Sequence, residues 1–431
     1  MVKLFEMIRS GAFLRHKLVK NTAALVIVQM SSYAAPLVVV PYLSRVLSTA
    51  HYGLIAFAVN FNWYFITFVE YGFNLTATRR IAIHQNDPAK VSQIFSSVLA
   101  AKALLTVVGF LMMVGVVAAV PKLRPDLLLF CLCYLAVIGD LLFPLWLFQG
   151  LQKMENLVWR DLLAKFAAAG LIFAFVHGDA DYLKAAGFQA GSTVLAGILG
   201  LISVPLLTQA RFVRPSLREI FIALREGWPV FLSMAAMTLS SSTNAFLLGL
   251  KSGPTDVAYY SASYRLIVAI RMLVSPLVTA IYPHMSHMAV ASREDAVTFL
   301  RKYGFVMAAP FLLASAVLFF GAAPIIHLVY SAKYQPAVPL LRIMALAPFL
   351  LAVQHVYSTF YMLAFGYEKE WSRVILQTAV LNFVILIPLI YLIWPPQAVS
   401  ITNIVLDLFV AAVTYLFFRR HTATIPQAAA A

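Results

Sequence analysis

Long apolar segments recur along the whole 431-residue sequence, and they constrain the fold more than any other feature. Each segment holds roughly 20 residues, the length that an α-helix needs to cross a hydrocarbon layer about 30 Å thick. Such a helix satisfies its own backbone hydrogen bonds and can therefore face lipid. Charged residues make up only 11% of the chain, against about a quarter in soluble domains. We therefore predict an all-α polytopic membrane protein with no separate soluble domain.

Turn residues and charges divide the sequence into about twelve predicted transmembrane helices. The first follows a basic amino-terminal segment and is too long to be the core of a cleaved signal peptide. At the ends of the second and eighth spans, the pattern does not determine whether the helix is continuous. The spans are predicted near residues 22–45, 52–78, 91–119, 127–149, 157–177, 184–208, 228–250, 256–283, 303–328, 339–365, 374–393 and 398–418.

Lysine and arginine are distributed unequally between alternate loops. The loops on the side that holds both termini carry 21 of them, whereas those on the other side carry six. By the positive-inside rule both termini are predicted to be cytoplasmic, in a multi-pass protein of the plasma membrane. This topology also explains most of the formal charge of +15. Because the charges are scattered between spans and form no single basic patch, we expect no nucleic acid partner.

A faint internal repeat relates the two halves of the chain. The fourth span ends at Phe148-Gln149-Gly150, and the tenth ends at Ala364-Phe365-Gly366, each with a lysine three residues after its glycine. Six spans in each half, with cytoplasmic ends in both, imply parallel repeats with a cavity between them at the midplane. The predicted organisation is an amino-terminal lobe at 1–208, a basic cytoplasmic linker at 209–226 and a carboxy-terminal lobe at 227–431.

Polar residues recur at steps of three and four along the second span, so they line one face of the predicted helix. Hydrogen bonds between helices are the ordinary explanation for such residues in membranes. The length of the run favours a water-filled cavity instead. The residues are Asn60, Tyr64, Thr67, Tyr71, Asn74 and Thr78.

Two arginines lie within the eighth span, Arg265 and Arg271. An arginine near the bilayer centre costs about 2.5 to 3.5 kcal/mol, so a partner, water or a function is expected there. One explanation is an ion pair with a carboxylate. The other is a fixed positive charge for an anionic substrate, since the planar guanidinium group matches a pair of phosphate oxygens. The acidic candidates for an ion pair are Glu70, Asp140, Asp161 and Asp407.

Three of these carboxylates are also candidates for ion coupling. Glu70 lies beside the polar face of the second span, where it could bind a proton or sodium ion or pair with Arg79 or Arg80; the pairing is the favoured interpretation. Asp140 and Asp407 lie deeper in apolar surroundings and are candidate proton carriers. A hydrogen bond from either aspartate to a neighbouring helix is the structural alternative.

Signatures of an enzyme are weak. Asp179 and Asp181 form an acid-x-acid pair, but their loop is too short to build a metal-dependent glycosyltransferase site. The sequence has no zinc motif, nucleotide-binding glycine loop or nucleophile elbow in a convincing setting. Cys131 and Cys133 lie two apart in one predicted helix and point to nearly opposite sides, so they cannot clamp a metal. A membrane glycosyltransferase is therefore the less favoured alternative, and no cofactor or metal site is expected.

Four short motifs are similar to those of a known family. They are PYLSRVL at 41–47, YGL at 52–54, EYGFNL at 70–75 and WLFQG at 146–150. Together they resemble the O-antigen flippases, in the polysaccharide-transport branch of the multidrug/oligosaccharidyl-lipid/polysaccharide exporter superfamily. The similarity covers nearly the whole chain through the twelve-span layout, although the recognisable motifs lie in the amino-terminal half.

The resemblance implies a V-shaped exporter of two six-helix bundles. Such a protein moves undecaprenyl-diphosphate-linked oligosaccharide from the cytoplasmic to the periplasmic leaflet of the bacterial inner membrane by alternating access. It acts without a cofactor, and coupling to H+ or Na+ is left open. The implied partners are membrane lipid, a polysaccharide polymerase and a chain-length regulator.

The candidate residues fit this implication. We assign Arg265 and Arg271 to the diphosphate, with Arg45 and Arg342 as weaker candidates near the external half. A drug or cation antiporter of the same superfamily is the alternative, and the low acid content, 17 Asp and Glu against 32 Lys and Arg, opposes it. The residues expected to face sugar are Asn60, Tyr64, Tyr71 and Asn74.

Overall fold

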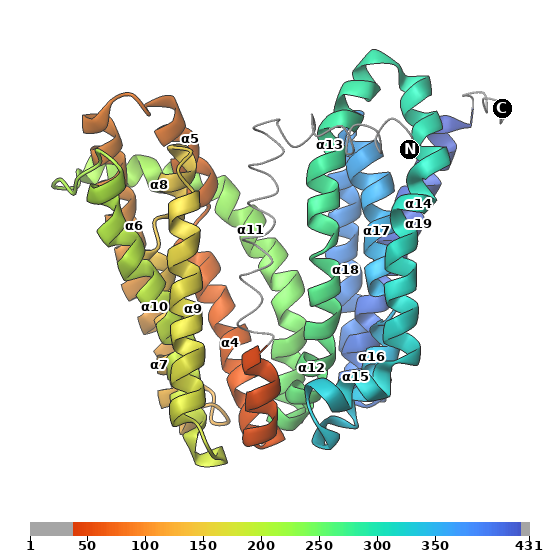
Figure 1. The fold of residues 1–431 in the computed structure, drawn as a ribbon, viewed down its shortest axis with the longest axis horizontal. Coiled ribbons are helices and arrows are strands. Elements are labelled where there is room, and N and C mark those ends of the chain that lie inside the picture. Colours follow the sequence, from red (N-terminus) through yellow and green to blue (C-terminus); the bar gives the residue numbers. More distant parts are fainter. Residues whose placement is uncertain (1–37, 424–431) are drawn as a thin grey trace. The chain divides into compact units, whose positions relative to one another are not determined.

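The structure, a computed structural model, describes residues 38–423, without the side chains at 155, 156, 158, 240, 241, 279 and 280. Every regular element in this range is a helix (Figure 1). Of the predicted first span at 22–45, only the helical residues from 38 onward are described. The all-α architecture predicted from the apolar segments is therefore confirmed.

The helices follow one another with short connections. The first group comprises α4 (Thr49–Glu70), α5 (Phe73–Ile83), α6 (Pro88–Ala119), α7 (Leu127–Leu142), α8 (Leu145–Gly150), α9 (Glu155–Phe175), α10 (Tyr182–Leu207) and α11 (Leu217–Ser252). The second comprises α12 (Pro254–Arg271), α13 (Val274–Ala291), α14 (Arg293–Phe320), α15 (Ala322–Val329), the 3-10 turn η3 (Ala332–Tyr334), α16 (Ala337–Met344), α17 (Ala347–Tyr357), the π-helical η4 (Ser358–Leu363), α18 (Glu368–Leu392) and α19 (Pro395–Thr422).

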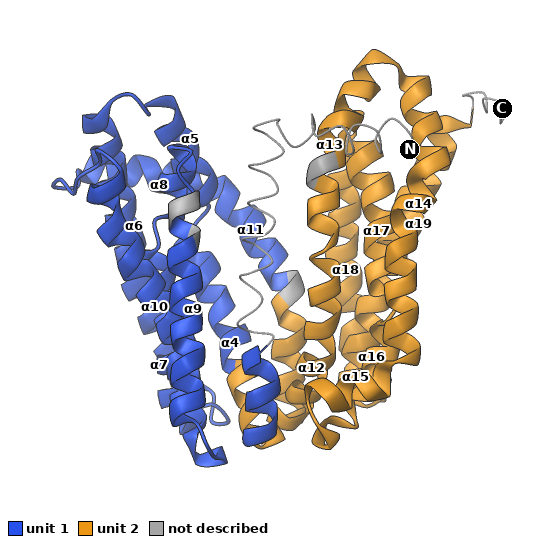
Figure 2. Cartoon of the chain, in the orientation of Figure 1, with its two compact units in different colours: residues 1–47, 58–239 blue, residues 48–57, 240–431 orange. Residues whose placement is uncertain are grey.

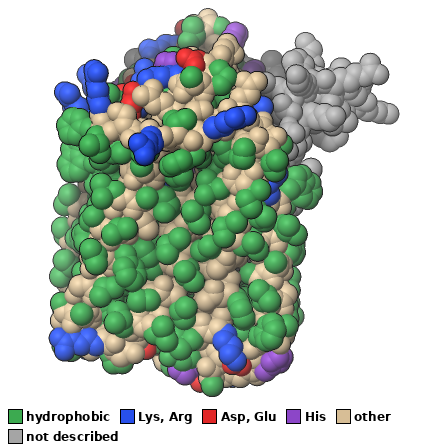
Figure 3. All heavy atoms as spheres, turned by 90° about the vertical axis from the view of Figure 1, so that its left-hand side faces the viewer, with side chains coloured by type: hydrophobic (Ala, Val, Ile, Leu, Met, Phe, Trp, Pro, Cys, Tyr) green, Lys and Arg blue, Asp and Glu red, His purple; other side chains and the backbone are tan. Residues whose placement is uncertain are grey.

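Ten helical stretches among the described residues are long and apolar enough to cross a membrane, and they lie at ten of the predicted spans. The predicted fifth span is helix α9, whose apolar character is interrupted by Arg160, Asp161 and Lys165. Figure 3 shows one face of the molecule, where hydrophobic side chains fill the middle and most Lys and Arg side chains lie toward the two ends. This distribution is typical of a multi-pass membrane protein.

The second and eighth spans are both interrupted. The second breaks between α4 and α5, where Tyr71 and Gly72 take positive φ angles of 49° and 78°. A Cβ atom on Gly72 would lie 2.5 Å from Cγ1 of Val230, so the site requires glycine for conformation and for space. The eighth span breaks between α12 and α13, at Met272 and Leu273.

The chain divides into two compact units (Figure 2). Unit 1 holds residues 1–47 and 58–239, and unit 2 holds residues 48–57 and 240–431. Helices α4 and α11 therefore each contribute to both units. The predicted linker at 209–226 belongs to unit 1 by this division, and the lobes at 1–208 and 227–431 stay a prediction.

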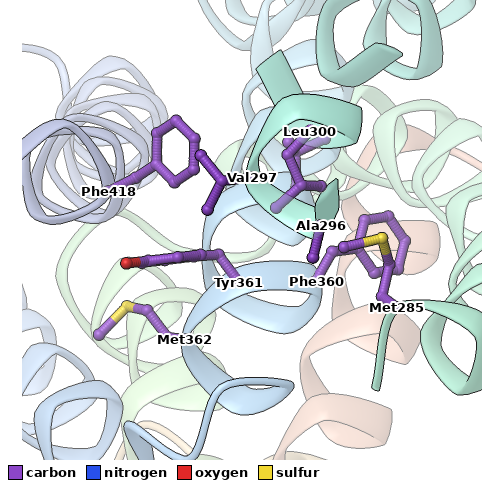
Figure 4. Packing of buried hydrophobic residues seen from close by; sticks show 9 residues of the cluster. Met285, Ala296, Val297, Leu300, Phe360, Tyr361, Met362 and Phe418 are labelled. Carbon is purple, nitrogen blue, oxygen red and sulfur yellow. The ribbon is translucent and has the colours of Figure 1, made fainter. Parts of the chain in front are cut away.

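Packing in unit 2 includes a buried cluster around the π-helical η4 (Figure 4). Phe360 and Tyr361 of η4 lie among side chains of α13, α14 and α19, including Met285, Leu300 and Phe418. The rings of Tyr361 and Phe418 meet edge to face, with 4.9 Å between their centroids. Close packing of this kind holds helices together in lipid, where apolar burial alone gives little advantage.

Candidate functional site

The two arginines of the eighth span have different surroundings in unit 2. Arg271, in the last turn of α12, forms an ion pair with Asp407 of α19. Gln354 of α17 donates from Nε2 to the backbone carbonyl oxygen of Asp407 at 2.9 Å, which fixes the same turn of α19. The ion-pair explanation therefore describes Arg271. Asp407, the candidate proton carrier, is neutralised by the same contact.

Arg265 lies six residues earlier on α12, half-buried among tyrosines. Its guanidinium carbon is 5.8 Å from the centroid of the Tyr52 ring. Tyr330 and Tyr334 lie against Tyr52, with ring centroids 6.5 and 5.9 Å away, and Arg265 interacts electrostatically with all three phenols. We call Tyr52, Tyr330 and Tyr334 the tyrosine cage. Within residues 38–423, no carboxylate pairs with Arg265.

The cage is assembled by a close approach of two helices. Gly53, at the start of α4, packs so tightly on α12 that a Cβ atom there would lie 1.8 Å from the carbonyl oxygen of Pro254. This contact places Tyr52 beside Arg265. The YGL motif at 52–54 was recognised in the sequence without a role, and the structure supplies one. No local pattern identifies Tyr330 and Tyr334, which come from the connection between α15 and α16.

The phenols of the cage are neutral hydrogen-bonding groups. Burial raises the pKa of Tyr330 and of Tyr334 above the ordinary value, although the Arg265 charge opposes this shift. The hydroxyl of Tyr334 is buried and has no hydrogen-bond partner among the described residues. The cage therefore surrounds the Arg265 charge without neutralising it.

The polar residues of the second span do not remain on one helix, because α4 ends at Glu70. Thr67 bonds to Thr238 of α11, with 2.9 Å between the hydroxyl oxygens, and Thr78 donates to the carbonyl oxygen of Trp146 at 3.1 Å. These two contacts are the hydrogen bonds between helices that the sequence left as an alternative.

Among the predicted sugar-facing residues, Tyr71 stacks on Phe231 of α11, with centroids 4.8 Å apart and an interplanar angle of 9°. Asn60 and Tyr64 lie half-buried on α4, and Asn74 lies in the first turn of α5. The two weaker arginine candidates, Arg45 and Arg342, are exposed and belong to different units.

Two carboxylates of unit 1 belong to a cluster that the sequence did not predict. Lys102 of α6 is only 2% exposed, and its Nζ lies 2.8 Å from Oδ2 of Asp140 and 2.8 Å from the Asp140 backbone carbonyl oxygen. Glu70 interacts electrostatically with Lys102 and Asp140. Asn74 donates from Nδ2 to Oε1 of Glu70 at 2.6 Å. We call Glu70, Asn74, Lys102 and Asp140 the Lys102 cluster.

The favoured pairing of Glu70 with Arg79 or Arg80 is wrong. Arg80 instead binds Glu219 at the start of α11, with 2.6 Å between Nη2 and Oε2. The missed signal was Lys102 itself, because an ionisable residue inside an apolar span requires a partner.

A chain of amide side chains crosses unit 2. Asn382 of α18 donates to Asn244 of α11 at 3.0 Å, Asn244 donates to Asn403 of α19 at 2.9 Å, and Asn403 donates to Tyr260 of α12 at 2.8 Å. These bonds connect four helices. In the sequence, Asn244 ends a polar run of five residues at 240–244 in the predicted seventh span. In the described part of the chain, no group of three or more His, Cys, Asp or Glu could hold a metal ion.

The fold is similar to those of solved membrane transporters. It is similar to the inward-facing conformation of a multidrug resistance MATE family transporter of the MOP superfamily, with a TM-score of 0.69 and 16% identity, covering 94% of this chain and 100% of that one. It is also similar to a MOP superfamily transporter from Pyrococcus furiosus, with a TM-score of 0.57 and 15% identity, covering 94% and 96% of the two chains. For that transporter, the reverse polarity of its binding pocket suggests a different function.

The sequence comparisons give the family. Residues 18–289 match the family described as "Polysaccharide biosynthesis protein". The chain is 31% identical over 402 residues to a "Putative O-antigen transporter" of Escherichia coli (strain K12), covering 93% of this chain and 97% of the relative. A protein of the same name from Shigella dysenteriae is 29% identical over 374 residues, covering 86% and 93%. The chain therefore belongs to the polysaccharide biosynthesis protein family, and the resemblance to O-antigen flippases is confirmed.

Proposed function

We propose that the protein is a flippase that moves undecaprenyl-diphosphate-linked oligosaccharide from the cytoplasmic to the periplasmic leaflet of the bacterial inner membrane by alternating access. Membership of the family and the names of its relatives support this substrate class. The observation that carries the proposal is Arg265. Its guanidinium group lies in a membrane span without a carboxylate partner among the described residues, and such a charge is costly unless it has a function.

A diphosphate is the chemical complement of this site. The guanidinium fork donates two parallel hydrogen bonds to a phosphate, and such charge-assisted bonds are stronger than neutral ones. The hydroxyl of Tyr334 is a further donor. Stacking over Tyr52 stabilises the cation by about 0.5 to 2 kcal/mol but leaves its charge available to an anion. Arg271, neutralised by Asp407, holds α12 against α19 and leaves Arg265 as the principal diphosphate ligand.

The sugars of the substrate need hydroxyl, amide and aromatic partners. Asn60 and Tyr64 of α4 supply an amide and a phenol, and Tyr71 and Asn74 follow at the break between α4 and α5. The exposed Arg45 and Arg342 serve as secondary contacts for phosphate on the external half.

Transport also needs a source of energy. An anion that leaves a negative interior gains about 2.3 kcal/mol per charge per 100 mV. The Lys102 cluster adds a site for a coupling proton, because its two carboxylates and one ammonium group become neutral when one proton binds. Sodium is the alternative ion for Glu70 and Asp140. We place both termini in the cytoplasm from the loop charges, and a polysaccharide polymerase and a chain-length regulator would act on the product.

The test is complementation of a strain that lacks the gene, with surface polysaccharide scored at matched protein levels. We expect Arg265→Ala to abolish export, because the diphosphate loses its fixed charge, and Arg265→Lys to retain part of it. Arg373→Ala removes an exposed arginine of α18 as the control and should export normally. Complete repeat units should accumulate on the cytoplasmic leaflet in the Arg265→Ala strain. Normal export by Arg265→Ala would remove Arg265 from the mechanism.

A further inference from the structure

The segment between α10 and α11 is held firmly against unit 1. Residues 209–216 form no helix, yet the backbone N–H of Arg211 donates to Oγ of Ser92 at 2.9 Å and that of Val213 donates to Oγ of Ser96 at 2.8 Å. Ser92 and Ser96 are buried and lie one turn apart on α6. The two bonds therefore fix an extended segment, which we call the linker, along the start of α6.

The linker turns charged and apolar side chains outward together. Arg211, Phe212, Val213 and Arg214 are all exposed, Phe212 to 64%. Guanidinium groups thus lie at both ends of a short apolar pair. Nothing in the described fold of unit 1 covers these side chains.

Exposed arginines and large apolar side chains continue on the first turns of α11. Leu217, Arg218, Phe221 and Arg225 are exposed, and at 100° per residue they fall within an arc of about 100° around the helix. The opposite side packs against unit 1 through buried residues such as Glu219 and Ala223. Together the exposed residues of the linker and of this arc form what we call the arginine face.

The arginine face keeps its positive charge. Glu219 is turned away from it and is neutralised by Arg80 at 2.6 Å and Lys90 at 3.0 Å. None of the four arginines on the face pairs with a carboxylate in the part of the chain that the structure describes. Four cations and three large apolar side chains are thus presented side by side.

We propose that the arginine face binds the headgroups of anionic phospholipids, with Phe212, Leu217 and Phe221 inserted among their acyl chains. The candidate membrane span of α11 begins at Leu217, so the exposed residues of its first turns lie where a membrane surface is expected and not in the aqueous phase alone. Arginine stems lie along apolar surface while their charged ends reach the headgroups. Basic residues near an anionic leaflet attract its lipids within a Debye length. An acidic protein would match the charges but not the apolar side chains at the edge of the span.

The position of the face gives the lipid a role. The linker joins α10 to α11, and α11 contributes to both units. A lipid that holds the linker also holds the start of a helix that the units share. This inference depends on the membrane-spanning fold and not on the identity of the transported substrate.

The test is a lipid titration of the purified full-length protein, read by native mass spectrometry with phosphatidylglycerol and phosphatidylcholine at equal concentrations. We expect the wild-type protein to retain phosphatidylglycerol preferentially. The variant Arg211→Gln/Arg214→Gln/Arg218→Gln/Arg225→Gln should lose this preference, with affinity falling about fivefold for each headgroup contact removed. The matched control, Lys369→Gln/Arg373→Gln/Arg419→Gln/Arg420→Gln, removes four exposed cations elsewhere and should keep the preference.

Two further variants separate charge from apolar contact and protect the test against misfolding. Arg214→Gln, in the linker and outside any helix, should weaken phosphatidylglycerol binding about fivefold and leave the melting temperature unchanged. Phe212→Ser should weaken retention of both lipids equally. The proposal is overturned if the wild-type protein retains both lipids alike, if the quadruple variant of the arginine face keeps the preference, or if the control loses it.

Discussion

Three cations in the described helices are each stabilised in a way that depends on their immediate neighbours. Lys102 and Arg271 each face an aspartate on another helix, whereas Arg265 faces phenol rings. A carboxylate neutralises a cation, and an aromatic ring stabilises it without removing its charge. The three residues are therefore similar in type and different in what they can do.

Replacing Lys102 tests how much a carboxylate partner contributes to the stability of a buried cation. Lys102→Ala leaves Asp140 without its ammonium partner, and we expect a loss of stability on the order of 2 kcal/mol, reduced by the partial exposure of Asp140. Lys102→Ala/Asp140→Asn should recover most of that loss. Thermal unfolding in detergent measures both. Asp140→Asn alone completes the cycle, and a loss in the double variant equal to the sum of the two single losses would show that the pair contributes no coupling energy.

Arg265 and Arg271 form a natural comparison, because they lie six residues apart on one helix. Arg271→Met should lower the melting temperature by several degrees, since it leaves Asp407 unpaired, and Asp407→Asn in the same chain should restore it. Arg265→Met should change the melting temperature little, because no carboxylate among residues 38–423 pairs with it. The same unfolding measurement gives both results. A larger loss for Arg265→Met than for Arg271→Met would contradict the assignment of roles.

The sequence shows where these charged residues lie but not which group each of them contacts. A charged residue in an apolar span is visible from composition alone. Its partner is not, because Asp407 lies 136 residues after Arg271 and meets it only when α12 packs near α19. The same limit explains why Glu70 was assigned to Arg80, which is near in sequence, and not to the Lys102 cluster.

At the scale of helices, the length of the apolar segments predicted where the helices lie but not where they are interrupted. Ten predicted spans coincide with membrane-spanning stretches, because length and hydropathy decide whether a helix can cross lipid. The interruption at Tyr71 and Gly72 depends on the positive φ angles of these two residues. In the sequence, only the glycine indicates such a conformation. Apolar residues stand on both sides of that point, Val69 before it and Phe73 after it, so the break could not be placed from the pattern.

Substitution of Gly72 tests this interruption. Gly72→Ala puts a Cβ atom at a φ of 78° and 2.5 Å from Val230, and we expect a loss of about 1 to 3 kcal/mol. Gly72→Ala/Val230→Ala removes the steric part and should recover only part of the loss, because the backbone strain remains. Thermal unfolding of the two variants separates the contributions. Full recovery in the double variant would mean that strain is negligible.

At the scale of the molecule, the chain is tied together by helices that it shares between its units. Residues 48–57 lie in unit 2 although the rest of α4 belongs to unit 1. Within unit 2 these residues are held by Gly53 against Pro254, by Phe57 stacked on Phe246 at 5.7 Å, and by Tyr52 in the tyrosine cage. The first turns of α4 therefore connect the second span to the candidate substrate site.

This connection predicts a strong effect from the smallest possible change. Gly53→Ala would place a Cβ atom 1.8 Å from the carbonyl oxygen of Pro254 and 2.6 Å from its carbonyl carbon. Backbone atoms cannot swing aside as a flexible side chain can, so α4 must withdraw from α12 and carry Tyr52 away from Arg265. We expect loss of export and a melting temperature lower by several degrees.

The control for Gly53 is another helical glycine with space around it. A Cβ atom on Gly191 of α10 meets nothing within 4 Å, so Gly191→Ala should leave export intact and stabilise the protein by up to about 1 kcal/mol. Export and thermal unfolding, measured on both variants, distinguish the close approach from a general intolerance of alanine. If Gly53→Ala exports normally, the contact between α4 and α12 does not position Tyr52, and the tyrosine cage must be held by Tyr330 and Tyr334 alone.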